Sequence, residues 1–130
     1  MISRRLVLAV VAALALSSAP AVLASETRVF DAAAFAAAQK AGRPILVEVT
    51  APWCPTCKAQ KPILEGFATR PELKNLIVFE VDFDSRKDVL AALNVRQQST
   101  LIAYKGTKEV GRSVGDTNVE SVTAMVGKSI

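Results

Sequence analysis

Apolar residues along this chain are concentrated in short runs whose length and composition are typical of β-strands. Two of these runs, Ile45–Val49 and Leu76–Phe83, are rich in branched residues and poor in polar ones, so they predict buried strands. Three shorter runs predict further strands, over Thr27–Phe30, Thr100–Tyr104 and Glu109–Ser113. The last two of these strands are joined by a glycine-containing turn over Lys105–Lys108, which predicts a β-hairpin.

The segments between the strands predict four helices. Asp31 is a suitable N-cap for the alanine-rich first helix, which Gly42 closes, and Asp84-Ser85 can cap the short third helix. In the last helix, valines recur at a helical spacing. The four predicted helices cover Ala32–Lys40, Cys57–Thr69, Arg86–Leu93 and Thr117–Val126.

The order of these elements indicates the fold class. Strands and helices alternate along the chain until a hairpin and a final helix complete it. This order predicts an α/β fold, a mixed central β-sheet with helices on both faces. We find no internal repeat and no linker, so residues 25–130 are predicted to form one domain.

The first 24 residues have the pattern of a cleaved secretory signal peptide. A positively charged start, Met1–Arg5, precedes the apolar run Leu6–Leu16, and small residues lead to a cleavage site after Ala24. A membrane anchor is the alternative. However, the run of 11 apolar residues is shorter than the roughly 18–20 that a spanning helix needs. We therefore expect export to an oxidising compartment and a periplasmic location.

Composition and charge exclude several classes of function. The chain has no His, which excludes a Ser-His-Asp triad, a Cys-His dyad and any His-ligated metal site. The net charge of +4 falls to +2 once Arg4 and Arg5 leave with the signal peptide. So weak a bias predicts no nucleic-acid partner. The only two cysteines are Cys54 and Cys57.

Two cysteines separated by two residues have several interpretations. A zinc site needs four ligands, and the chain offers no second pair. Haem attachment needs a His after the second Cys, where Lys58 stands. A redox dithiol needs a strand before the pair and a helix after it, and both are predicted. A static disulfide is the alternative, but a loop this short restrains the unfolded chain little. We therefore predict a redox-active pair and no cofactor.

The predicted geometry assigns a role to each thiol. Cys54 should lie at the helix N-terminus, where unpaired backbone N–H groups and the helix dipole favour the thiolate that attacks a disulfide. Cys57, one turn further, should be more buried and should resolve the mixed disulfide. Pro55 fits the first turn, since its missing N–H has no partner there.

The segment Ile45–Lys58 resembles the active-site segment of thioredoxins, and the likeness extends over nearly all of residues 25–130. Trp53 matches the family's Trp before the first Cys, and Pro62 matches the proline inside its active-site helix. The Pro55-Thr56 dipeptide is closer to the type found in periplasmic members than to Gly-Pro. The resemblance implies that client proteins contact Trp53, Pro55, Thr56, Gln98, Ser99, Thr100 and Gly115.

Two acidic residues correspond to family positions behind the second Cys. Glu48 stands where thioredoxins have a buried Asp that moves the proton of the resolving thiol, which implies the same role here. Burial would raise the pKa of its carboxyl and suit it to proton transfer near neutral pH. Glu80 stands where the family often has a Lys that pairs with this carboxylate. Either Glu80 points to solvent, which we prefer, or the two carboxyls share a proton.

Ser99 is the largest departure from the family. Thioredoxins have a cis-proline directly before the residue that matches Thr100, and they use it to align the substrate. A cis bond without proline costs about 2.5–4 kcal/mol, so we expect the Gln98–Ser99 bond to be trans, or strained if cis. Loss of the proline ring would also uncover the thiols.

We interpret the sequence as a periplasmic thiol–disulfide oxidoreductase, a reductase or electron relay that acts as a monomer. Its expected partners are client proteins with disulfides or thiols and a redox-recycling partner such as a membrane thiol relay. Two alternatives stay open: a dimer that binds a metal or iron–sulfur cluster through Cys54 and Cys57, and a non-catalytic thioredoxin-like interaction module.

Overall fold

The computed structural model describes residues 25–130, so the predicted signal peptide over residues 1–24 lies outside the described residues. Five strands and four helices appear in the predicted order. The strands are β1 (Glu26–Val29), β2 (Pro44–Thr50), β3 (Ile77–Asp82), β4 (Thr100–Lys105) and β5 (Lys108–Val114). The helices are α1 (Ala32–Lys40), α2 (Pro55–Gly66), α3 (Lys87–Ala92) and α4 (Val119–Gly127), and two short 3-10 turns, η1 (Phe67–Thr69) and η2 (Pro71–Leu73), follow α2.

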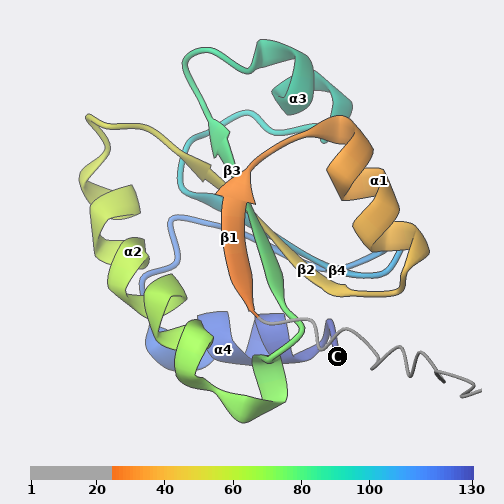
Figure 1. The fold of residues 1–130 in the computed structure, drawn as a ribbon. Helices are drawn as coiled ribbons and strands as arrows, with labels where there is room; N and C mark the ends of the chain where they lie inside the picture. Colours follow the sequence, from red (N-terminus) through yellow and green to blue (C-terminus); the bar gives the residue numbers. More distant parts are fainter. Residues whose placement is uncertain (1–24) are drawn as a thin grey trace, which may run out of the picture.

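The strands form one mixed sheet in the order β1-β3-β2-β4-β5. β3 runs parallel to both β1 and β2, whereas β4 is antiparallel to β2 and β5 is antiparallel to β4. This arrangement confirms the predicted α/β fold with a mixed central sheet. It places β2, which leads into the cysteine pair, at the centre of the sheet, where it is bonded on both edges (Figure 1).

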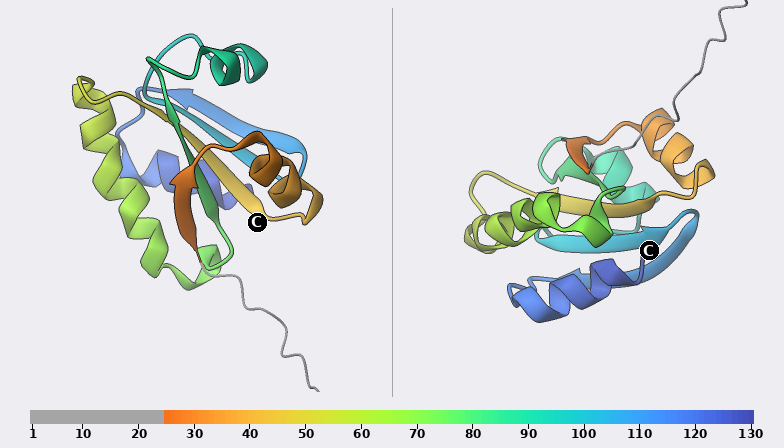
Figure 2. Two further views of the ribbon diagram at one scale, coloured as in Figure 1. Left: turned by 45° about the horizontal axis from the view of Figure 1, so that its top comes forward. Right: turned by 60° about the horizontal axis from the view of Figure 1, so that its bottom comes forward.

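Helices cover both faces of the sheet, as the sequence predicts (Figure 2). The face under α1 and α3 is aromatic: Phe35 packs in edge-on or tilted contacts against Phe30, Phe79 and Tyr104. The face under α2 and α4 is mainly aliphatic, with residues such as Leu64 and Val126 packed on the sheet. None of the helices in residues 25–130 combines the length and the apolar character needed to cross a membrane.

Predicted boundaries of α2, α3 and α4 are wrong, and α4 begins at Val119, with Asn118 as N-cap, rather than at Thr117. α2 begins at Pro55 rather than Cys57, because Pro55 can occupy the first helical position with Cys54 as N-cap. It ends at Gly66, after which η1 and η2 continue the chain. Asp84-Ser85 does not cap α3, whose N-cap is Arg86. Instead, both backbone N–H groups of this pair donate to Asp82 Oδ1, at 2.8 and 3.2 Å, in a turn that follows β3.

Candidate active site

The cysteine pair lies at the start of α2, joined by a disulfide with Cα atoms 5.3 Å apart. Cys54 is the N-cap in an extended backbone conformation, and its Sγ accepts the backbone N–H of Cys57 at 3.1 Å. An N-cap atom in this position receives an N–H that has no partner inside the helix. The first turn of α2 therefore stabilises negative charge on the Cys54 sulfur once the disulfide opens.

Burial does not distinguish the two cysteines. Cys54 is 1% exposed and Cys57 is 2% exposed, so the prediction that Cys57 is the more buried is wrong. The disulfide holds both sulfurs in one environment, packed with Ala51 and against the partly buried Phe83. What separates the two thiols is their place on the helix, since only Cys54 Sγ is at the N-cap.

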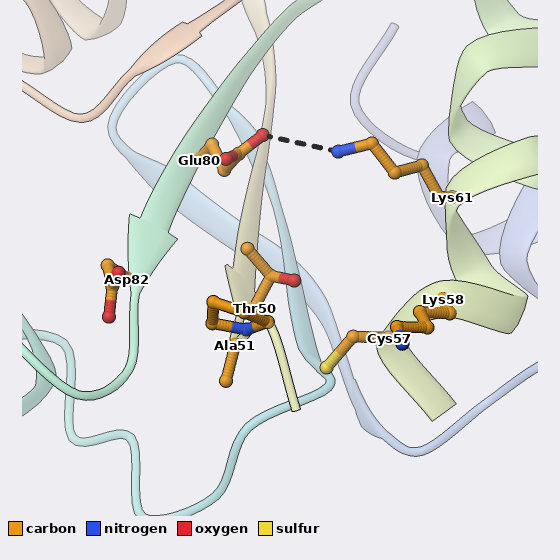
Figure 3. Close-up of a pocket in the computed structure, with 8 residues that line it drawn as sticks. Thr50, Ala51, Cys57, Lys58, Lys61, Glu80 and Asp82 are labelled. Carbon is orange, nitrogen blue, oxygen red and sulfur yellow. Dashed lines mark ion pairs between the residues drawn. The ribbon is translucent and has the colours of Figure 1, made fainter. Parts of the chain in front are cut away.

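A pocket of about 240 Å³ opens beside Cys57, between the start of α2 and the ends of β2 and β3 (Figure 3). The pocket wall contains Cys57 together with two basic and two acidic side chains. The lining residues are Thr50, Ala51, Pro52, Cys57, Lys58, Lys61, Glu80 and Asp82. Solvent protons can therefore reach the neighbourhood of Cys57 from the side of Glu80.

Glu48 is buried, as the sequence predicts, at 4% exposure in the middle of β2. Its Oε1 has no hydrogen-bond partner among the residues that the structure describes. Burial is the main cause that raises the pKa of Glu48 from 4.5 to about 7. The negative charge of Glu80 adds to the increase, and the positive charge of Lys61 opposes it. A carboxyl with this pKa exchanges its proton near neutral pH, which suits a general acid or base.

Lys61 and Glu80 connect the two polar regions behind the cysteines. Lys61 Nζ lies 3.7 Å from Glu80 Oε2, and both side chains are partly exposed (Figure 3). They line the pocket beside Cys57 and also a smaller one, about 140 Å³, that contains Glu48. The preferred prediction that Glu80 points to solvent is confirmed. The sequence analysis missed Lys61, although its position four residues after Cys57 places it on the same side of the helix.

The loop before β4 places Ser99 against the centre of the sheet. No cis peptide bond occurs in residues 25–130, so the Gln98–Ser99 bond is trans, as preferred from the sequence. Ser99 has φ +56°, in the left-handed region that few side chains adopt without strain. Its backbone N–H donates to Val49 O at 2.8 Å, and its carbonyl accepts the N–H of Gly115 at 3.0 Å.

Gln60 is a second residue that the sequence analysis missed. It is 1% exposed on α2, one turn after Cys57, and its Nε2 donates to Ser99 O at 3.1 Å and to Asp116 O at 3.0 Å. A polar residue three positions after the second Cys, on the inner side of the helix, was the available signal. The amide links the active-site helix to the loops on either side of β4 and β5.

Trp53 is exposed beside the cysteine pair, at 54%. Its indole Nε1 donates to Asp84 Oδ2 at 2.8 Å, and its ring meets that of Phe83 edge-on, with centroids 6.4 Å apart. The Asp84 carboxylate, expected to cap a helix, instead orients the indole. Asp84 and Phe83 thus hold the indole on one side, while the rest of its surface stays open to solvent.

The other predicted client-binding residues lie near the start of α2, and two of them are buried. A Cβ on Gly115, which has φ +72°, would lie 3.9 Å from both Ser99 Oγ and Thr56 Cγ2, so these residues are close neighbours. Pro55 is exposed and Gln98 partly exposed. Ser99 and Thr100 are 5% and 2% exposed, and their hydroxyls donate to Gln98 O and Gln97 O, each at 2.6 Å, so both side chains shape the loop from inside.

Residues 25–130 hold no group of three or more His, Cys, Asp or Glu side chains arranged to bind a metal ion. The site consists of a dithiol, one buried carboxyl and a surrounding face of Trp53, Thr56 and Gly115 next to the buried Ser99. This combination allows thiol–disulfide exchange with a local proton acceptor.

Comparison with known proteins agrees with this geometry. The family model described as thioredoxin matches residues 26–128. The chain belongs to the thioredoxin family. It is 36% identical over 84 residues to a thioredoxin of Chlamydia trachomatis serovar D, which covers 65% of this chain and 80% of that protein. It is 35% identical over 77 residues to Thioredoxin Asp f 29 of Aspergillus fumigatus, covering 59% of this chain and 70% of that one.

A solved structure is also similar. The crystal structure of Trxlp from Edwardsiella tarda EIB202 superposes with a TM-score of 0.75 and 40% identity, over 78% of this chain and 98% of that one. Thioredoxins are thiol–disulfide oxidoreductases, and this member has a CxxC pair joined by a disulfide. The chain is therefore an enzyme of this type, and the resemblance inferred from its sequence is confirmed.

Proposed function

We propose that the protein is a periplasmic disulfide reductase or electron relay in which Cys54 attacks, Cys57 resolves and Glu48 accepts a proton. The hydrogen bond from the Cys57 N–H to Cys54 Sγ carries this assignment, because it favours the thiolate at Cys54. Such a thiolate is the nucleophile of disulfide exchange.

The proposed reaction reduces one client disulfide in two steps. The Cys54 thiolate attacks a client sulfur, which forms a mixed disulfide and releases one client thiolate. Cys57 then gives its proton to Glu48 and attacks Cys54 Sγ, which releases the second client thiolate. Two electrons pass from the protein dithiol to the client, and the Cys54–Cys57 disulfide seen in the structure is the product.

Clients are proposed to dock on the face around the disulfide. Trp53 supplies an exposed aromatic surface, and Pro55, Thr56, Gln98 and Gly115 extend it, with the buried Ser99 next to Thr56 and Gly115. Thr100 contributes from within the loop. The protein is proposed to act as a monomer, without a cofactor.

Location and recycling complete the proposal. The signal-peptide pattern of residues 1–24 supports export to the periplasm, with Ser25 as the first residue after cleavage. A reductase in an oxidising compartment needs a source of electrons, so we propose a recycling partner such as a membrane thiol relay. N-terminal sequencing of exported protein tests the first point, and a start at Met1 would contradict it.

The reduction potential against glutathione, measured together with insulin reduction, tests the function. We expect turnover and a potential nearer the roughly −270 mV of a reductase than the roughly −120 mV of a strong oxidant. Absence of turnover would favour a non-catalytic interaction module. Visible absorbance and bound metal after anaerobic purification would favour a metal- or cluster-binding dimer.

A further inference from the structure

Ser99 holds a left-handed backbone conformation beside the disulfide without a proline or glycine to favour it. A non-glycine residue with φ +56° keeps this conformation only when its surroundings impose it. Ser99 is only 5% exposed, but it adjoins Thr56 and Gly115 on the proposed client face. Whatever imposes its backbone conformation therefore also affects the shape that a client meets.

Three hydrogen bonds hold the Ser99 backbone. Its N–H donates to Val49 O, and its carbonyl accepts from Gly115 N–H and from Gln60 Nε2. The first two join backbone groups. The Gln60 amide is the side-chain contribution, and it also reaches Asp116 O at 3.0 Å.

The orientation of the Gln60 amide follows from its partners. Both are carbonyl oxygens, which only accept hydrogen bonds, so the NH₂ group must face them and Oε1 must point away. Gln60 Oε1 is buried and without a hydrogen-bond partner in the described part of the chain. Burial of an unpaired oxygen is unfavourable, and an aliphatic side chain would fill the same space without that cost. The double donation is therefore the specific contribution of Gln60.

The loop after β5, which contains Asp116, is also held at the start of α4. Asp116 Oδ1 accepts the N–H of Asn118 at 2.9 Å, and Asp116 Oδ2 accepts the hydroxyl of Ser121 at 2.5 Å at the start of α4. With Gln60 bound to Asp116 O, the loop after β5 is held between α2 and α4. One buried amide thus ties the helix that carries the cysteines to both loops that border them.

We propose that Gln60 is the positioning residue of the client-binding face: it holds the Ser99 and Asp116 loops in place and so sets the affinity for protein clients. This inference rests on the proposed reductase function. Gln60 makes no hydrogen bond to Cys54, whose contact with Cys57 N–H is within the first turn. Loss of the amide should therefore weaken client binding and leave the reactivity of the disulfide toward a small thiol unchanged.

The test compares Gln60→Met, which keeps the length of the side chain and removes both donors, with Gln39→Met on α1 as the control. For insulin reduction, we expect the KM of Gln60→Met to rise about tenfold with little change in kcat, as for one or two lost hydrogen bonds. The reduction potential and the rate of reduction by dithiothreitol should match the wild type. Gln39→Met should leave all of these values unchanged, since α1 covers the other face of the sheet.

Three outcomes would overturn the inference. An unchanged KM would show that the loops do not need the amide, and an equal loss of reactivity toward dithiothreitol would show a general structural role. If Gln60→Met does not fold, the exchange of side-chain protons in the wild type is measured instead. The NH₂ protons of Gln60 should exchange with water more slowly than those of Gln39. Equal exchange rates for the two side chains would be the third outcome that overturns the inference. A wild type without insulin reduction would instead refute the proposed function, and the inference with it.

Discussion

Cys54 and Glu48 are both buried where β2 and α2 meet, yet their surroundings act in opposite directions on the ionised form. At Cys54, a backbone N–H of the first helical turn points at the sulfur and favours negative charge. At Glu48, in the middle of β2, no hydrogen bond from the described residues reaches Oε1, and the neighbouring strand β3 carries another acid, Glu80, in register. The contact between α2 and β2 therefore favours a thiolate at the N-terminus of the helix and a protonated carboxyl in the middle of the strand.

The difference shows how the fold separates two tasks. The helix terminus supplies electrostatic stabilisation for the proposed nucleophile, Cys54, whereas the sheet interior supplies desolvation for the proposed proton carrier, Glu48. Neither environment would serve the other group: a buried thiol without the helix N–H would keep its proton and be a poor nucleophile, and a carboxylate stabilised by such an N–H would be a weak base.

The largest effect is expected at the helix terminus. Cys54→Ser should abolish disulfide exchange, because it removes the proposed nucleophile, while Cys57→Ser should keep the attack and accumulate mixed disulfides with clients. Non-reducing gels of the two variants after incubation with a client protein provide the measurement. Accumulation with Cys54→Ser instead would reverse the roles of the two thiols.

Ser99→Pro tests the loop that packs against β2 beside Glu48. Proline fixes φ near −65° and has no N–H, whereas Ser99 has φ +56° and donates to Val49 O at 2.8 Å. We expect a loss of about 3 kcal/mol in the free energy of unfolding and lower reductase activity.

Ser99→Gly is the matched control, because glycine keeps the N–H and adopts positive φ without strain. Urea unfolding of both variants provides the comparison. Unchanged stability with Ser99→Pro, together with higher activity, would mean that the loop readily adopts the proline-containing arrangement of other thioredoxins.

Glu48→Gln tests the sheet interior. The native state holds the Glu48 proton up to a pH of about 7, whereas an unperturbed glutamate releases it near 4.5. The native state therefore binds more protons than the unfolded chain in this range, and wild-type stability should fall by about 3 kcal/mol as the pH rises through it. Glu48→Gln should not show this decrease.

The same variant should slow turnover around neutral pH, by about tenfold or more if Glu48 accepts the proton. Denaturant unfolding and kcat/KM are measured from pH 4.5 to 8 for both proteins. Parallel stability curves would contradict the raised pKa of Glu48, and an unchanged pH–rate profile would exclude it as the proton carrier.

The smallest effect is expected from removing the charge of Lys61, which lines both the pocket beside Cys57 and the pocket that contains Glu48. Lys61 lowers the pKa of Glu48, so Lys61→Met should shift the pH–rate profile toward higher pH. Lys58→Met is the control, since Lys58 also lines the pocket beside Cys57 but does not contribute to the pKa of Glu48. A shift of equal size in both variants would indicate a general effect of removing positive charge.

Local patterns predicted most of the fold correctly because they depend on neighbouring residues. The apolar runs of β2 and β3 and the N-cap Asp31, whose Oδ1 accepts Ala34 N–H at 2.8 Å, appear in the structure as expected. The start of α2 was misplaced by two residues, since the preference of Pro55 for the first helical position competes with the turn before it. The cap of α3 was wrong because Asp82 Oδ1 holds Asp84 and Ser85 in a turn through their backbone N–H groups, and the Asp84 carboxylate accepts the indole N–H of Trp53.

The family, the redox pair and the buried acid can be predicted from the sequence, because a CxxC pair between a strand and a helix and a Glu inside an apolar strand are local signals. The equal burial of the cysteines, the pairing of Lys61 with Glu80 and the link from Gln60 to Ser99 depend on tertiary packing. Gln60 and Ser99 are 39 residues apart, and their contact exists because α2 packs over a sheet whose central strands come from distant segments. Such contacts depend on how helices and strands pack, which no local pattern specifies.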